Sequence, residues 1–213
     1  MLEIKTFVVN PVQENNYLLY DETKEAVIID CGAHTNNEKR QLSDFIRETG
    51  LTLKHVLNTH LHFDHILGNS YLYETYGLKP EYNSKDEGMP GLKEGIIKFA
   101  LATFKCPFIF AGQYLEDGAV ISFGNSRLKA IATPGHSPGS LSFYSEKDAC
   151  VFTGDALFRF NIGRTDLWCG NYEELIHSIK TKLFTLPSAT VVYPGHEGTS
   201  TIGEEIEHNP YTS

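Results

Sequence analysis

The residues best suited to chemistry are five His and two Asp, concentrated in four short segments. The segments are Thr59-His60-Leu61-His62-Phe63-Asp64-His65, Thr133-Pro134-Gly135-His136, Thr153-Gly154-Asp155 and Tyr193-Pro194-Gly195-His196. Neutral imidazole and carboxylate both bind divalent cations of intermediate hardness. Each segment follows a β-like run, and strands that end together bring their loops to one edge of a sheet. We therefore expect a metal site built from separate loops.

The number of candidate ligands predicts two metal ions. A single tetrahedral catalytic zinc takes three protein ligands and a water molecule, whereas seven donors are present here. Two metals that share one carboxylate fit this supply better. On a helix, His60 and His62 would point about 200° apart, because each residue turns the chain by about 100°. We therefore expect this pair on a loop.

Composition limits the class of protein. The chain has 213 residues, 41% hydrophobic and 21% charged, which is typical of a globular protein and predicts one domain over residues 1–213. No apolar stretch reaches the ~20 residues that span a membrane. The N-terminus has no pattern of a secretory signal, so we expect a cytoplasmic location. The net charge of −9 and the lack of a basic run disfavour nucleic acid as a partner.

Four cysteines, Cys31, Cys106, Cys150 and Cys169, are widely spaced and form no C-x-x-C pair. A chain of this size does not need disulfides to fold. We expect all four to be reduced thiols that pack in the interior.

The first half of the sequence predicts an antiparallel meander followed by helices. Residues 4–9, 17–20 and 26–30 are typical of strands. Residues 37–49 place Leu42 and Ile46 on one face and stop at Gly50, which predicts an amphipathic helix with a glycine cap. A strand over residues 53–58 then leads to the first ligand segment, and a helix over residues 66–76 ends at Gly77.

The second half repeats this order. We predict strands over residues 119–123, 127–132, 141–144, 150–152 and 190–193, and a helix over residues 172–183. Residues 79–113 contain three prolines, and we expect a variable cover segment there with a helix over residues 92–104. Strands followed by helices in each half favour two sheets packed face to face with helices outside.

The ligand segments resemble those of the metallo-β-lactamase fold superfamily, whose motif is T-H-x-H-x-D-H followed by later His, Asp and His residues. All seven positions match, and the resemblance covers essentially the whole chain. It is closest to short, glyoxalase II-like hydrolases. The stretches that support this narrower match are T-P-G-H-S-P-G-S at 133–140, G-R-T-D-L at 163–167, Y-P-G-H at 193–196, T-I-G-E-E at 201–205 and Asn209-Pro210.

This resemblance implies an α/β fold, a four-layer αββα sandwich of two mixed sheets. It implies that one metal is held by His60, His62 and His136. The other metal would be held by Asp64, His65 and His196. Asp155 would bridge the two, and Asp64 would also orient the nucleophile. The cofactors are then two divalent ions, with zinc as the first choice and iron and manganese as alternatives.

The implied activity is hydrolysis of a thioester by a metal-bound hydroxide, which forms near neutral pH. S-lactoylglutathione or a related S-acylglutathione is the leading small-molecule substrate, for a monomer or small homo-oligomer. Longer glyoxalase II enzymes carry a further C-terminal helical domain that helps to bind glutathione, and we expect none after Asn209-Pro210. The alternatives are an iron-dependent persulfide dioxygenase, which has the same fold and a similar G-R-T-D stretch, and a lactone or ester hydrolase.

A few residues outside the seven ligands have predicted roles. Arg164 is a candidate for substrate contact, although an ion pair with Asp166 is the preferred interpretation. Asp30, at the end of a strand, is expected to support the metal loops. The pair Asn15-Asn16 is predicted to form a turn. The other histidines, His34, His55, His177 and His208, match no cluster and are expected to be ordinary core or surface groups.

Overall fold

A computed structural model describes residues 1–89, 111–167 and 169–212 of the chain. The strands are β1 (Glu3–Val9), β2 (Glu14–Tyr20), β3 (Glu25–Ile29), β4 (Thr52–Leu57), β5 (Glu81–Tyr82), β6 (Gln113–Tyr114), β7 (Val120–Phe123), β8 (Ser126–Ala132), β9 (Leu141–Ser145), β10 (Cys150–Gly154), β11 (Leu157–Phe158), β12 (Asn161–Ile162), β13 (Val191–Pro194) and β14 (Ser200–Thr201). The helices are α1 (Asn36–Thr49), α2 (Phe63–Ile66), α3 (Asn69–Tyr76), α5 (Tyr172–Ser178) and α6 (Ile202–His208), with helical turns η1 (Ser84–Gly88) and η2 (Ile179–Leu183).

The main strands form two mixed sheets of six strands each. The first has the order β1-β2-β3-β4-β5-β6, antiparallel from β1 to β3 and parallel from β3 to β6. The second has the order β14-β13-β10-β9-β8-β7, in which only β10 and β13 pair in parallel. Parallel neighbours need a crossover connection, and helices lie in three of these: α1 between β3 and β4, α2 and α3 between β4 and β5, and α5 with η2 between β10 and β13.

The two sheets pack face to face around one core. Tyr17, Leu19 and Val27 of the first sheet lie in the same buried cluster as Phe143 and Phe152 of the second. The rings of Tyr17 and Phe152 meet edge-on, with centroids 5.2 Å apart. Alternate residues of these strands face the helices instead, because successive side chains of a strand point to opposite faces.

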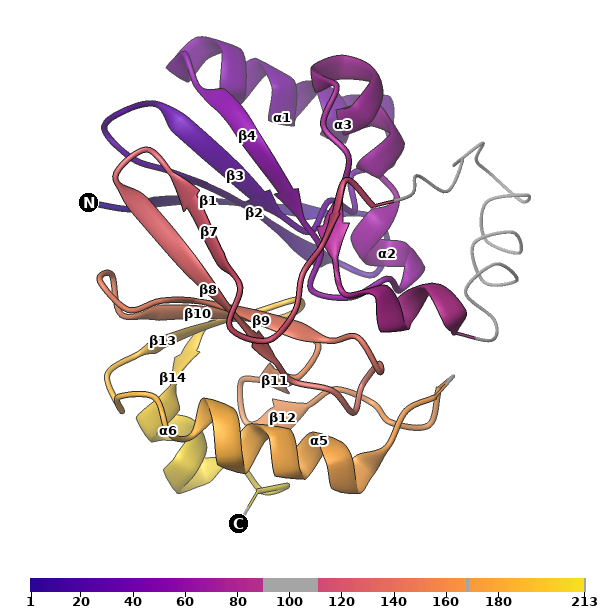
Figure 1. The fold of residues 1–213 in the computed structure, drawn as a ribbon, viewed down its shortest axis with the longest axis vertical. Helices are drawn as coiled ribbons and strands as arrows, with labels where there is room; N and C mark the ends of the chain where they lie inside the picture. Colours follow the sequence, from indigo (N-terminus) through magenta and orange to yellow (C-terminus); the bar gives the residue numbers. More distant parts are fainter. Residues whose placement is uncertain (90–110, 168, 213) are drawn as a thin grey trace.

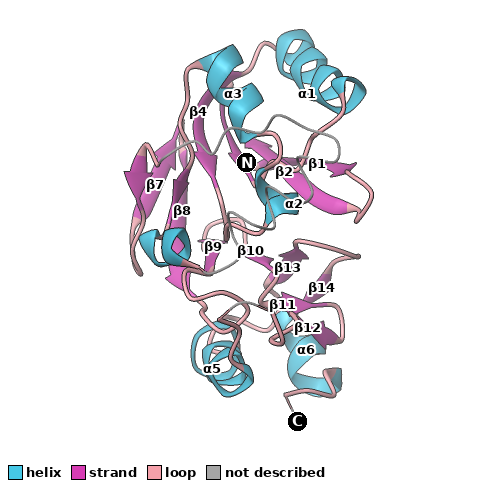
Figure 2. Ribbon diagram, turned by 90° about the vertical axis from the view of Figure 1, so that its right-hand side faces the viewer, coloured by secondary structure: helices cyan, strands magenta, loops and turns pink. Residues whose placement is uncertain are grey.

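Helices cover the outer faces of both sheets. Leu42 and Ile46 of α1 pack with Leu72 of α3 against the first sheet, and α1 and α3 lie together at the top of Figure 1. Leu175 of α5 and Ile202 of α6 belong to the cluster beneath the second sheet. The edge-on view places α5 and α6 at the opposite end of the molecule from α1 and α3 (Figure 2). The architecture is the expected four-layer αββα sandwich.

The predicted strands and the first predicted helix are confirmed, with small shifts at their ends. Helix α1 begins after Thr35, whose side chain accepts a hydrogen bond from Glu38 N, while the Glu38 side chain accepts one from Thr35 N. The helix ends at Gly50, which has φ +67°. This capping box satisfies two of the free amides at the helix start. The predicted helix over residues 172–183 is observed as α5 followed by the π-helical turn η2.

One prediction for the first half is confirmed with a shifted start, and one is wrong. The helix expected over residues 66–76 is observed as α3, which begins three residues later and ends at Gly77 as predicted. The Gly68 amide, between α2 and α3, donates to the carbonyl of Cys31 at 2.7 Å. Asn15 and Asn16 lie in β2 rather than in a turn. Both side chains donate inside the protein, Asn15 to Pro194 O and Asn16 to Cys31 Sγ, whereas the buried Asn16 Oδ1 has no hydrogen-bond partner among the described residues. Buried polar groups with partners are compatible with a strand.

Several elements were not predicted, namely β5, β6, β11, β12, β14 and α6. The strands among them have only two residues, too few to show an alternating pattern. Within the cover segment at 79–113, the structure describes β5, η1 and β6. The helix predicted over residues 92–104 falls outside the described residues.

The cysteines follow the prediction only in part. Cys31 and Cys150 are buried free thiols, whereas Cys169 is a free thiol that lies exposed. The prediction that Cys169 packs in the interior is therefore wrong: this residue, which follows the G-R-T-D stretch in the sequence, lies on the surface. Cys106 lies outside the described residues. Within the described part of the chain, no helix is long and apolar enough to cross a membrane.

Candidate metal centre

The first ligand segment starts where β4 ends. His60 and His62 lie on the loop between β4 and α2, as predicted, whereas Asp64 and His65 lie within the single turn of α2. The loop is fixed from below by Asp30, which follows β3 with φ +55°. Its carboxylate accepts from Thr59 N at 2.8 Å and from Thr59 Oγ1 at 2.7 Å. The predicted supporting role of Asp30 is thus borne out.

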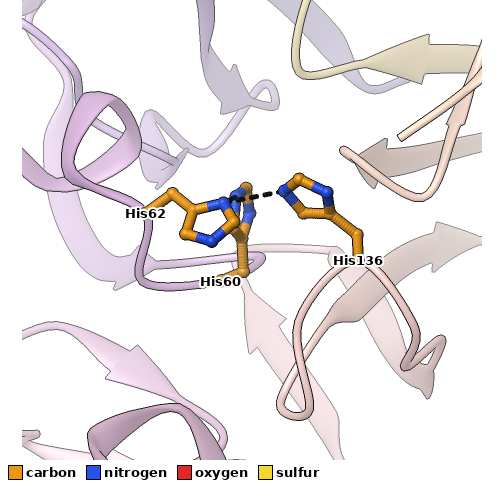
Figure 3. Close-up of side chains that lie close together, drawn as sticks. All are labelled: His60, His62 and His136. Atoms are coloured by element: carbon orange, nitrogen blue, oxygen red, sulfur yellow. Dashed lines mark hydrogen bonds between the residues drawn. The ribbon is translucent and has the colours of Figure 1, made fainter. Parts of the chain in front are cut away.

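Three histidines form the first triad: His60, His62 and His136. His62 Nδ1 lies 3.1 Å from His60 Nε2 and 2.8 Å from His136 Nε2. In Figure 3, His60 and His62 project from one loop, and the ring of His136 meets them from the loop that follows β8. All three side chains are buried. The first triad therefore joins loops from both sheets.

Hydrogen bonds on the far side of the rings decide which nitrogen faces the centre. His136 Nδ1 lies 2.7 Å from the carbonyl oxygen of Arg164, which can only accept, so Nδ1 carries the proton. Thr59 donates its hydroxyl proton to Asp30 and accepts from His60 Nδ1 at 3.0 Å. His60 and His136 therefore turn the lone pairs of Nε2 toward His62 Nδ1.

The second triad consists of Asp64, His65 and His196. Asp64 Oδ2 lies 3.6 Å from His65 Nε2 and 3.2 Å from His196 Nε2. His65 Nδ1 donates to Asp30 Oδ2 at 2.9 Å, and His196 Nδ1 donates to the carbonyl of Val12 at 3.1 Å. Each imidazole again presents Nε2 to the centre, held by an acceptor behind it, as is usual for metal-ligating histidines.

Asp155 lies between the two triads. Its Oδ1 is 3.3 Å from His65 Nε2, and its Oδ2 is 3.5 Å from His136 Nε2 and 3.7 Å from His196 Nε2. One carboxylate oxygen thus faces the second triad, and the other reaches both. The side chain follows β10, the central strand of the second sheet. This position suits a carboxylate shared by two cations.

The donor set fits divalent metals. Within the described residues, the first triad, the second triad, and His60 with His65 and Asp155 each bring three ligand atoms within 4.8 Å of one another. Two buried atoms at the centre, His65 Nε2 and Asp155 Oδ1, have no well-formed hydrogen bond to any described residue. Buried polar atoms normally have a partner, and a cation would supply one here.

The two triads differ in their protonation chemistry. Burial, and then the neighbouring His65 and His62, lower the pKa of His60 well below its usual value; burial and His136 lower the pKa of His62 to about 3. Burial opposes a charge on His65, but Asp155 and the other carboxylates raise its pKa well above the usual value. His60 and His62 are therefore neutral at pH 7, whereas the field around His65 favours a cation.

Burial also opposes ionisation of the two acidic ligands. For Asp155, attraction to His65 and His136 outweighs burial and holds the pKa well below its usual value. The pKa of Asp64 is lowered for the same reason, through His65 and His196. Both groups are therefore carboxylates at neutral pH, which is the form that binds metals.

The structure brings all seven predicted ligands together. The Arg164 side chain, in contrast, does not point into this cluster. The Arg164 guanidinium is exposed and binds Asp166 through two hydrogen bonds of 2.8 and 2.9 Å, which confirms the predicted ion pair. Its main-chain carbonyl orients His136. Among the described residues, His34, His55, His177 and His208 belong to none of the groups that could hold a metal.

Two buried carboxylates near the centre were not predicted. Glu14 is fully buried in β2, accepts from Gly32 N at 3.1 Å, and has a pKa raised well above its usual value by burial. Asp86, in η1, accepts from the loops that carry His60, His62 and His136. Glu14 precedes the Asn pair that was misread as a turn, and Asp86 lies in the cover segment, so neither had a clear signal in the sequence.

Comparison with known proteins identifies the family. The family model described as the metallo-beta-lactamase superfamily matches residues 9–196. The chain belongs to the metallo-β-lactamase superfamily. Within this superfamily it is 34% identical over 212 residues to hydroxyacylglutathione hydrolase GloC of Haemophilus influenzae, covering 99% of this chain and 98% of that protein. It is 37% identical over 199 residues to the mitochondrial persulfide dioxygenase ETHE1 of Bos taurus, covering 91% and 69%.

Two solved structures with similar sequences have the same fold. BLEG-1 B3 metallo-beta-lactamase superposes with a TM-score of 0.87 at 33% identity, covering 99% of this chain and all of that one. TTHA1623, solved in a di-iron-bound form, superposes with a TM-score of 0.82 at 34% identity, covering 97% and 99%. These relatives are named for different activities, so membership of the superfamily does not by itself define the substrate.

Proposed function

We propose that this metallo-β-lactamase superfamily member is a dinuclear metallohydrolase that cleaves thioesters. The observation that carries the proposal is the presence of two complete triads with the Asp155 carboxylate between them. The proposed substrate is an S-acylglutathione, with S-lactoylglutathione first. The match to GloC over nearly the full length of both chains supports this choice.

In this proposal, one divalent ion would be held by His60, His62 and His136. The other would be held by Asp64, His65 and His196, with Asp155 between them. When bound, the ions would supply hydroxide near neutral pH and a Lewis acid for the thioester carbonyl. Imidazole and carboxylate ligands suit zinc, and they also suit iron or manganese. The di-iron form of TTHA1623 keeps iron among the candidates.

Asp64 has a second role in the proposal. It is ionised, and Oδ2 contacts His196 Nε2 at 3.2 Å, so the carboxylate retains acceptor capacity for a second partner. A hydrogen bond from the attacking water to Asp64 would orient that water toward the substrate carbonyl. We assign to Asp64 both metal ligation and orientation of the nucleophile.

The leaving group needs little help from the protein. A thiol with a pKa of about 8.5 departs readily as a thiolate, particularly beside a cation. The seven ligand side chains include no group set aside as a general acid, and thioester cleavage does not require one. Arg164 remains a candidate for substrate contact, with its guanidinium on the surface and its carbonyl on His136.

An iron-dependent persulfide dioxygenase is the second candidate, favoured by the 37% identity to ETHE1. In that reading only three of the seven ligands, two His and one Asp, would hold the iron. The two activities can be told apart by the co-substrate: hydrolysis consumes water, whereas dioxygenation consumes molecular oxygen.

The test is hydrolysis of S-lactoylglutathione by protein loaded with zinc, and separately with iron or manganese, compared with a His60→Ala variant prepared in parallel. We expect turnover that is lost in His60→Ala. Oxygen uptake with glutathione persulfide, and no thioester cleavage by any metal form, would overturn the hydrolase in favour of the dioxygenase.

A further inference from the structure

Asp86 is a buried carboxylate that lies outside the seven ligands yet contacts the loops that carry the first triad. It is 1% exposed and lies in η1, immediately after β5. Hydrogen bonds of Asn83, the N-cap of η1, hold this turn in place. The Asn83 side chain accepts from Lys85 N at 3.1 Å and donates to Leu115 O at 2.8 Å. Asp86 therefore occupies a fixed position at the edge of the first sheet.

The carboxylate accepts three hydrogen bonds: one from the loop that carries His60 and His62, and two from the loop that carries His136. Oδ2 accepts from Leu61 N at 3.0 Å, and Leu61 stands between His60 and His62 in the sequence. Oδ2 also accepts from Ser137 Oγ at 3.0 Å, and Oδ1 accepts from Gly139 N at 2.6 Å. Ser137 directly follows His136. One side chain thus joins the loops that supply all three ligands of the first triad.

The fit around this carboxylate is tight on the side of Gly139. A Cβ placed on Gly139 would lie 2.6 Å from Asp86 Oδ1 and 2.8 Å from Asp86 Cγ. The absence of a side chain at residue 139 is what lets the amide approach so closely. Hydrogen bonds to this one carboxyl group therefore hold the two loops together, next to the backbone hydrogen bond from Leu141 N to Thr59 O at 2.8 Å.

We propose that Asp86 is the positioning residue of the first triad: its carboxylate holds the His60–His62 loop and the His136 loop at the separation that binds a metal. The inference rests on the metal centre of the proposed function and is independent of the substrate. Asp30 supports both triads, through His65 directly and through Thr59 behind His60. The contacts of Asp86 are instead to the loops that carry the first triad. Supporting hydrogen bonds of this kind typically change metal affinity by about 10- to 100-fold.

The experiment is a titration of metal-stripped Asp86→Asn with zinc in competition with a chromophoric chelator. His60→Ala in the same assay identifies which of the two binding steps belongs to the first triad. Asparagine keeps the shape but replaces one acceptor oxygen with a donor amide, which must face Leu61 and Ser137 or Gly139. We expect the first-triad step to weaken by about 10- to 100-fold, with the second step largely unchanged. The visible spectrum of cobalt bound to the first triad should change as well.

Asp21→Asn is the matched control. Asp21 is equally buried and also joins loops of the two sheets, since it accepts from Asn125 N and Ser126 Oγ, but neither partner is next to one of the seven ligands in the sequence. This variant should lose stability and keep both metal steps. A folded Asp86→Asn protein with the wild-type zinc affinities and cobalt spectrum would overturn the proposal, as would equal weakening of both steps.

If Asp86→Asn does not fold, Ser137→Ala decides the question, because it removes one of the three donors and leaves the charge in place. It should weaken the same first-triad step by a smaller factor; unchanged affinity there would overturn the proposal. Since the readout is metal affinity, a wild-type protein that binds two metals and hydrolyses no thioester would contradict the proposed substrate alone.

Discussion

The first and second triads lie on either side of the Asp155 carboxylate, but they differ in the charge and exposure of their side chains. The first contains only imidazoles, all buried, and joins loops of both sheets. The second includes the carboxylate of Asp64, and its His196 is 20% exposed. The difference teaches that the first triad depends on the position of its loops, because it contains no carboxylate to attract the imidazoles. In the second triad, the Asp64 carboxylate attracts His65 and His196.

The hydrogen bonds that support the ligand side chains also differ between the first and the second triad. The first triad is fixed by a hydroxyl, a main-chain carbonyl and the loop contacts of Asp86. The second is fixed by the charged pair of His65 with Asp30. Changes to shared or supporting groups should therefore affect the two metals unequally, which leads to four predictions.

The largest effect should come from Asp155→Ala, which removes the group common to both triads. Because even supporting residues cost about 10- to 100-fold in metal affinity, we expect both metals to bind more than ~100-fold more weakly. Metal titration of the stripped variant measures this directly. Two metals held at undiminished affinity would show that Asp155 does not bridge.

Loss of a single imidazole should affect one metal. His60→Ala should abolish tight binding by the first triad and spare most of the binding by the second, and His196→Ala should do the reverse. Stepwise zinc affinities of the two variants, measured side by side, test this. Loss of both metals in each variant would mean that the two triads form one cooperative site.

Asp30→Asn should have a smaller effect, concentrated on the second triad. It weakens the acceptor behind His65 Nδ1, so we expect the second metal to bind about 10- to 100-fold more weakly. The first metal should be affected less, through Thr59 and His60. Equilibrium dialysis with metal analysis gives both values, and a greater loss at the first triad would contradict the division.

The smallest effect on the metals should come from Asp21→Asn, which tests stability alone. Burial would raise the pKa of Asp21, but hydrogen bonds from Thr23, Ser126 and Asn125 lower it to about 2. Because the folded pKa is below the ordinary value of 3.8, the ionised group stabilises the fold above about pH 4, and this contribution is lost as the pH falls toward 2. We expect a loss of roughly 2 kcal/mol at pH 7.

Urea unfolding of wild type and Asp21→Asn at several pH values checks this. The difference between the two proteins should shrink steadily below pH 4. A difference that stays constant down to pH 2 would show that the charge of Asp21 does not contribute to stability.

The sequence predicted the architecture and all seven clustered side chains because these depend on local patterns. Alternating apolar residues marked the long strands, and each ligand segment followed one of them. The start of α3 was predicted three residues too early, because the Gly68 amide before it binds the carbonyl of Cys31, which is distant in the sequence. Asp86 was missed for the same reason: its partners at residues 61, 137 and 139 meet it only in the folded chain.

Polar residues inside strands were the other source of error. Asn15 and Asn16 have the composition of a turn, yet Asn15 donates to Pro194 O of the second sheet, and Asn16 donates to Cys31 Sγ on the helix-covered side of the first sheet. A buried amide with partners costs little, and nothing in the local sequence announces those partners. The exposure of Cys169 likewise depends on where the loop after β12 lies, which its neighbours in sequence do not determine.

The most direct test of the dinuclear thioester hydrolase is the rate of S-lactoylglutathione hydrolysis measured against the number of metal ions bound per chain. Stripped protein would be loaded stepwise, and metal content and rate would be determined on the same samples. We predict that the rate rises with occupancy of the second ion and reaches its maximum at two ions per chain. Full activity at one ion per chain, or no hydrolysis at two, would contradict the account.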